Sequence, residues 1–154
     1  MDEHEFEKTY RNYTHELCPF QRAILNATST CKLCQKVIIA EREAVTCADA
    51  NARHVCRLFI QKLKENAGFA LKHLEKDAPM PNNKELKLLC GGLQGLGEIL
   101  AETHHAPVTD VSTLLLLSVN QYGHVEQIPY HRLVRAITTY QPRKKNKPQQ
   151  SNIP

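Results

Sequence analysis

The stretch CKLCQKVIIAEREAVTC spans residues 31–47 and carries three of the chain's six cysteines. The serine and threonine directly before it are favourable helix N-caps, so we predict a helix from about Cys31 to Ala44. On such a helix Cys31 and Cys34 share one face of the first turn. The partial positive charge at a helix N-terminus favours thiolate over thiol, which is the form that binds metals and attacks disulfides.

Helix signals dominate on both sides of this stretch, and the sequence predicts an all-α fold, a bundle of five to seven helices. Apolar residues recur at spacings of three and four, and prolines stand where first turns are expected. The remaining predicted helices cover residues 3–17, 19–25, about 46–74, 84–103, 110–122 and 129–140. Leu114–Leu117 also fits a buried strand, so two alternatives stay open there. The predicted helix 84–103 contains four glycines, which implies very close packing or room for a ligand against its backbone.

The length of 154 residues suits one compact domain. Residues 78–83, with two prolines and two asparagines, break the chain. They separate a cysteine-rich part, residues 1–77, from a helical part, residues 84–141. We therefore expect a single helical domain over residues 1–141. The basic segment 142–154, rich in proline, lysine and glutamine, is predicted to be a disordered tail.

Composition favours a cytoplasmic protein with no membrane association. Hydrophobic residues make up 42% and charged residues 23%, close to ordinary globular usage. The longest apolar run is far shorter than the roughly 20 residues of a spanning helix. The N-terminus is acidic where a secretory signal would be basic and then apolar. In a reducing compartment, six cysteines point to metal binding, thiol chemistry or burial rather than to disulfides.

Four of the cysteines follow the spacing C-x12-C-x2-C-x12-C. They are Cys18, Cys31, Cys34 and Cys47. Each can be placed at a helix end, although Cys34 and Cys47 converge only if the chain turns between them, given about 100° per residue on a helix. Four thiolates in such an arrangement match a tetrahedral zinc site or a [4Fe–4S] cluster.

The spacing loosely resembles that of helical iron–sulfur domains, with a central C-x2-C between two distant cysteines. A zinc ribbon normally pairs two C-x2-C motifs, and only one is present. We therefore predict a [4Fe–4S] protein of electron transfer, redox sensing or cluster delivery, with a protein redox partner. Because a chain of this length can build a core unaided, we expect a redox centre rather than a structural metal. At a helix N-terminus the cluster's reduced state would be favoured.

Two alternatives remain. Zinc could stabilise a regulatory or interaction module, or Cys31 and Cys34 could be the attacking and resolving thiols of a thiol–disulfide oxidoreductase. Against the oxidoreductase, the sequence lacks the strand that usually precedes a redox C-x2-C motif. No motif of a phosphate-binding loop, serine hydrolase or zinc protease is present, so an enzyme is the less favoured class.

The other candidate ligands are interpreted mainly as core residues. Cys90, next to two glycines, is the first replacement if Cys18 or Cys47 is not a ligand, and Cys56 is the second. His54 would give a variant site of three cysteines and one histidine. The basic residues of the tail leave nucleic acid open as a further partner.

Overall fold

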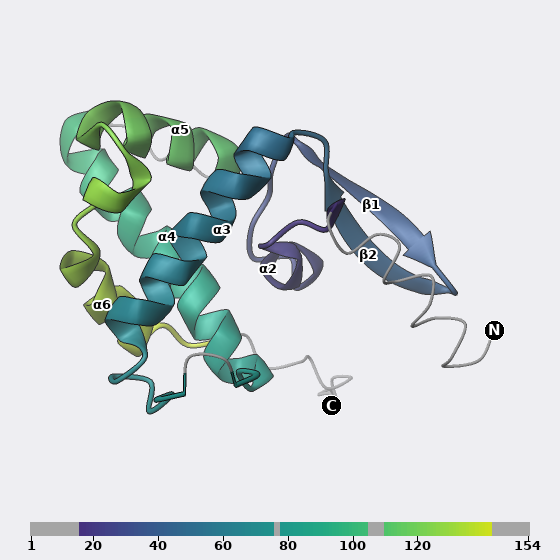
Figure 1. Cartoon of the computed structure of the whole chain (residues 1–154), viewed down its shortest axis with the longest axis horizontal. Helices are drawn as coiled ribbons and strands as arrows, with labels where there is room; N and C mark the ends of the chain where they lie inside the picture. Colours follow the sequence, from purple (N-terminus) through teal and green to yellow (C-terminus); the bar gives the residue numbers. More distant parts are fainter. Residues whose placement is uncertain (1–15, 76–77, 105–109, 143–154) are drawn as a thin grey trace, which may run out of the picture.

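The computed structural model describes residues 16–75, 78–104 and 110–142. The elements in chain order are α2 (Gln21–Leu25), β1 (Cys34–Ile39), β2 (Arg42–Cys47), α3 (Ala50–Ala67), α4 (Asn82–His104), α5 (Val111–Tyr122), the short 3-10 helix η2 (Val125–Gln127) and α6 (Tyr130–Thr139). Helices α3 to α6 pack together, and the hairpin of β1 and β2 projects from one end of them beside α2 (Figure 1). The predicted helix 3–17 and tail 142–154 lie almost wholly outside the described residues.

The described part is mostly helical, as predicted, but it is not all-α. The helix predicted from Cys31 to Ala44 is wrong, because this segment forms most of an antiparallel hairpin whose register runs from Cys34 opposite Cys47 to Ile39 opposite Arg42. Two local features favour the hairpin. The run Val37–Ile39 is β-branched, which lowers helix propensity and raises strand propensity. The two turn residues, Ala40 and Glu41, have φ of 51° and 68°, as a two-residue type I′ turn requires.

Most of the other predicted helices are confirmed. Helices α2, α4 and α6 lie within about two residues of the predicted ends, and α5 is a helix, which excludes the strand alternative for its leucines. Asp110 caps α5 and Gly123 ends it with a positive φ of 88°. The exception is α3, which begins after its N-cap Asp49 and ends at Ala67, well short of the predicted Leu74.

The core lies between α3, α4, α5 and α6. Its fully buried side chains include Phe59, Leu63, Leu96 and Leu133. The glycines of α4 allow the close approach that the sequence suggested: a Cβ at Gly91 would lie only 2.6 Å from the Ile137 Cα of α6. This close backbone contact makes α4 and α6 the most extensive pair of the fold.

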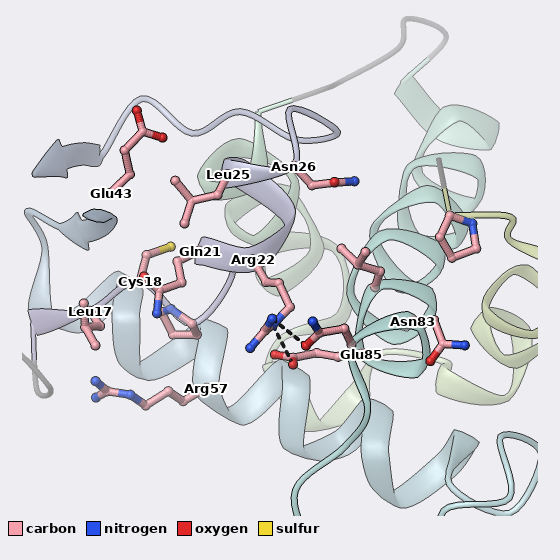
Figure 2. Close-up of a pocket in the computed structure, with 14 residues that line it drawn as sticks. Leu17, Cys18, Gln21, Arg22, Leu25, Asn26, Glu43, Arg57, Asn83 and Glu85 are labelled. Carbon is pink, nitrogen blue, oxygen red and sulfur yellow. Dashed lines mark hydrogen bonds and ion pairs between the residues drawn. The ribbon is translucent and has the colours of Figure 1, made fainter. Parts of the chain in front are cut away.

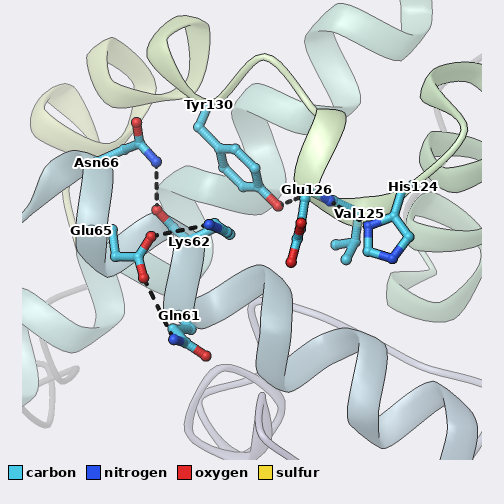
Figure 3. A network of polar contacts seen from close by, with 8 residues as sticks. All are labelled: Gln61, Lys62, Glu65, Asn66, His124, Val125, Glu126 and Tyr130. Carbon is cyan, nitrogen blue, oxygen red and sulfur yellow. Dashed lines mark hydrogen bonds and ion pairs between the residues drawn. The ribbon is translucent and has the colours of Figure 1, made fainter.

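The first residue of α6, Tyr130, binds η2 through its buried side chain. The Tyr130 phenol donates to the Val125 carbonyl oxygen at 2.6 Å (Figure 3). The Tyr130 ring packs 5.8 Å, centroid to centroid, from that of Phe59 on α3. Burial raises the pKa of the Tyr130 phenol above its ordinary value. The phenol therefore stays protonated and keeps donating its hydrogen bond.

Candidate metal centre

Both edges of β2 are paired in the described structure. The hairpin gives it β1 on one edge, and residues 17–18 lie along the other, where Leu17 bridges Thr46 and the Cys18 backbone N–H donates to the Val45 carbonyl oxygen at 2.8 Å. The Gln21 side chain of α2 accepts from the Val45 N–H at 3.2 Å. The segment that carries Cys18 is thereby fastened to the hairpin.

The pleat of the three paired segments, β1, β2 and residues 17–18, places three cysteines on one face. Side chains alternate along a strand, so Cys47 and Val45 share a face, and their neighbours on the two adjacent segments, Cys34 and Cys18, share it too. This face packs against the main core. Leu17, Ile39 and Ala44 form a separate small cluster on the opposite face, as the alternation requires.

Cys34 stands directly opposite Cys47. The Ala48 N–H donates to the Leu33 carbonyl oxygen at 2.9 Å, so Leu33 and Ala48 form a hydrogen-bonded pair. Because the two kinds of pair alternate along an antiparallel ladder, Cys34 and Cys47 form a non-hydrogen-bonded pair. The Cα atoms of such non-hydrogen-bonded pairs are about 4.5 Å apart, closer than in the alternate pairs. The chain turns between Cys34 and Cys47, as their convergence required. The turn is that of a β-hairpin and does not lie between two helices.

Cys31 lies in a turn that leads into β1. The Cys34 N–H donates to the Cys31 carbonyl oxygen at 3.2 Å. Inside this turn the Lys32 N–H donates to the Asp110 carboxylate at 2.6 Å, and the Val111 N–H donates to the Thr30 carbonyl oxygen at 2.9 Å. The C-x2-C turn is therefore held against the start of α5. The expectation that a helix N-terminus favours the Cys31 thiolate is wrong, because no helix begins there.

A fifth cysteine joins this group. Cys56 is buried on α3, and its pKa is raised first by burial and then by the thiols of Cys18, Cys31 and Cys47. Cys90 lies elsewhere, with its sulfur 3.1 Å from the Thr28 hydroxyl. Of the two replacement ligands, Cys56 and not Cys90 packs near the other thiols, whereas the sequence placed Cys90 first. His54 is exposed on α3.

Three thiols of this group, those of Cys18, Cys34 and Cys56, have a pKa above that of an ordinary cysteine. Burial raises the pKa of Cys18 to about 12, with further increases from Cys47, Cys31 and Cys34. Burial and the neighbouring Cys31 also raise the pKa of Cys34, although Lys36 opposes them. Catalytic thiols have lowered pKa values. Buried thiols close together suit a metal cation, whose charge deprotonates its thiol ligands.

As placed in residues 16–75, 78–104 and 110–142, no three histidine, cysteine, aspartate or glutamate side chains stand close enough together to hold a metal ion. Cys34 and Cys47 are register partners and Cys18 lies on the same face, but side-chain rotations would have to bring four sulfurs to ligand distance. Such rotations are compatible with Cys31, Cys34 and Cys47, which are only half-buried.

Two openings reach the group. A cavity of about 770 Å³ is lined by Cys18 and by the ion pair of Arg22 and Glu85, whose atoms lie 2.8 Å apart (Figure 2). A second cavity, of about 310 Å³, is mainly apolar and reaches Cys56 between α3 and α5. The two cavities end at Cys18 and Cys56, whose side chains are themselves almost wholly buried.

Two positioning residues escaped the sequence analysis. Asp110 is a favourable N-cap type at the start of the predicted helix 110–122, but nothing in the sequence indicated its bond to the C-x2-C turn. Gln21 carried no signal, because its role depends on the hairpin that was missed. Both support the cysteines without being candidate ligands.

Fold and site together define a helical domain with a cysteine-rich hairpin. Comparisons with protein-family models, curated proteins and solved structures found no match to this chain. None of the helices in the described ranges has the length and apolar character needed to cross a membrane.

Proposed function

We propose that this protein is a cysteine-ligated metal protein whose ligands are Cys18, Cys31, Cys34 and Cys47. One observation carries the proposal: Cys34 faces Cys47 across the hairpin, and Cys18 lies on the same face. Cys31 joins them through a turn fixed to α5. Three separate chain segments thus supply the four thiols, whose sulfurs would meet after side-chain rotation.

The geometry favours zinc as the metal and a structural role for it. The helices α3 to α6 have a core of their own, but the hairpin is a two-stranded sheet, and such sheets are marginal in water without further support. A zinc ion bound by four thiolates would join the hairpin, the turn and the Cys18 segment to the bundle. The argument that this chain is long enough to build a core without a metal therefore applies to the bundle and does not extend to the hairpin. The resulting function is a zinc-stabilised regulatory or interaction module.

A [4Fe–4S] cluster is the second candidate. The observation that favours it is the fifth thiol, Cys56, since a cluster is larger than a single ion and takes ligands from several segments. Its function would be electron transfer, redox sensing or cluster delivery to a protein partner. In that case Cys56 would be one of the cluster's four ligands, and Cys56→Ser would lower cluster content, whereas it would leave zinc bound by the four named thiols unchanged.

Anaerobic purification followed by metal analysis separates the two candidates. Zinc predicts a colourless protein in which a chelator increases hydrogen exchange in the hairpin and leaves α4 and α6 protected, because metal-binding free energy contributes to local folding. An iron–sulfur cluster predicts a brown protein with reversible reduction, followed by visible absorbance and electron paramagnetic resonance. A chain that binds neither zinc nor iron would contradict the proposal.

A further inference from the structure

We propose that Cys34 and Cys47 form an oxidation site, a cross-strand disulfide that replaces the metal. The release of metal rests on the function proposed above, whereas the bond itself needs only the hairpin. The two cysteines are register partners at a non-hydrogen-bonded position. No other cysteine pair in the described residues is matched across two strands.

Non-hydrogen-bonded pairs in antiparallel sheets have the backbone dimensions that a disulfide needs. Cα atoms of non-hydrogen-bonded partners are about 4.5 Å apart, and disulfides span about 4.4–6.8 Å between Cα atoms. Their Cβ atoms lie about 4.5–5.5 Å apart and must approach slightly. The tight turn at Ala40 and Glu41 fixes the register, so the two thiols cannot slip past each other.

Solvent exposure of the thiols also favours a bond between Cys34 and Cys47. Cys34 and Cys47 are half-buried, whereas Cys18 and Cys56 are buried. Cys31 is the competing partner, since the Cys34 N–H closes a turn onto its carbonyl oxygen. The strand directs the Cys34 side chain to the face that carries Cys47, and this favours the cross-strand bond.

The oxidant is a hydroperoxide, such as hydrogen peroxide. One thiolate attacks a peroxide oxygen, which forms a sulfenic acid and releases hydroxide. The second thiolate attacks that sulfur, so the S–S bond forms, the S–O bond breaks and a second hydroxide leaves. The two thiol protons convert both hydroxides to water. Two sulfurs are oxidised and the peroxide is reduced. The site then keeps only two of its four ligands, and a small thiol restores it by exchange.

Trypsin allows a direct test, because it cleaves between the three cysteines. Cys31, Cys34 and Cys47 fall in the separate peptides 23–32, 33–36 and 43–53. The full-length chain, freed of metal with a chelator and a reductant, is treated with hydrogen peroxide and digested without reduction. We expect a linked pair of peptides 33–36 and 43–53, reversed by dithiothreitol and absent in Cys34→Ser and Cys47→Ser. The Cys90→Ser control keeps it.

The same oxidation of the metal-loaded chain tests the link to the metal. We expect the metal to protect the thiols, and its release to rise in step with the linked peptides. A dominant bond between peptides 23–32 and 33–36, or oxidation without any linked pair, would overturn the inference. A chain that forms the predicted bond but binds no metal would refute the proposed function and leave the oxidation site standing.

Discussion

The Cys18 N–H donates to the Val45 carbonyl oxygen at 2.8 Å, and this bond aligns Cys18 with the cysteine face of the hairpin. Val45 is fully buried, and its own N–H is satisfied by the Gln21 side chain. The backbone of one hairpin residue thus holds both the cysteine and the helix that follows it. The account of the metal centre depends on this attachment.

Gln21→Ala should lower the free energy of unfolding by about 1–3 kcal/mol, because it leaves the buried Val45 N–H without its acceptor. The matched control is Gln35→Ala on β1, where the glutamine side chain is exposed. Its effect should stay within about 0.5 kcal/mol. Urea unfolding of the metal-free chain measures both, and equal effects would show that the Val45 bond contributes nothing.

Asp110→Ala should weaken metal binding as well as stability. Asp110 caps α5 and also accepts from the Lys32 N–H inside the C-x2-C turn. Asp49→Ala is the control, since Asp49 caps α3 through the N–H groups of Asn51 and Ala52 and holds no part of that turn. Each loss should cost about 1 kcal/mol of unfolding free energy. Only Asp110→Ala should raise the dissociation constant for zinc in a competition titration with a chromogenic chelator.

Acid should remove the contribution of Asp110. Burial raises the pKa of its carboxyl, but hydrogen bonds from Ser112, Thr113 and Lys32 together lower it below the ordinary value. A lowered folded-state pKa gives stability above the unfolded-state pKa of about 3.9, which is lost as the pH falls through the folded value. The advantage of the wild-type chain over Asp110→Asn should therefore shrink below about pH 4. Urea unfolding of both metal-free chains between pH 3 and pH 6 tests this, and a constant difference would contradict it.

Gly91→Ala should destabilise the bundle by about 1–3 kcal/mol, as overpacking of close-fitting elements does. A Cβ there would meet two backbone atoms, the Ile137 Cα at 2.6 Å and the Ala136 oxygen at 2.9 Å, so α6 itself would have to move. Gln94→Ala, exposed on the same helix, should change stability by less than about 0.5 kcal/mol. Thermal unfolding of both variants checks the difference. A Gly91→Ala chain as stable as wild type would show that α4 and α6 separate easily.

The sequence predicted correctly those helices whose ends carry capping residues or glycines. Asp110 and Gly123 mark both ends of α5, and the glycines of α4 indicated its close packing. Residues 31–44 were misassigned because N-cap residues before Cys31 outweighed the β-branched run Val37–Ile39. The turn that reverses the chain uses alanine and glutamate at positive φ, where glycine or asparagine would have given the signal.

The candidate ligands came from cysteine spacing alone, and the sequence could not show how they meet. The facing of Cys34 and Cys47 follows from strand register, and the neighbourhood of Cys56 follows from how α3 packs. Both are tertiary relationships with no local signature. The bonds of Asp110 to Lys32 and of Gln21 to Val45 join residues far apart in the chain, which periodicity and capping patterns do not report.

The central claim is that the cysteines around the hairpin hold a metal, and metal content per chain tests it most directly. Full-length wild type, Cys47→Ser and Cys90→Ser are purified anaerobically, and zinc and iron are measured by mass spectrometry against protein concentration. The account predicts one metal centre in wild type and in Cys90→Ser, and loss of most of it in Cys47→Ser. Wild type without zinc or iron, or Cys47→Ser with the full content, would contradict it.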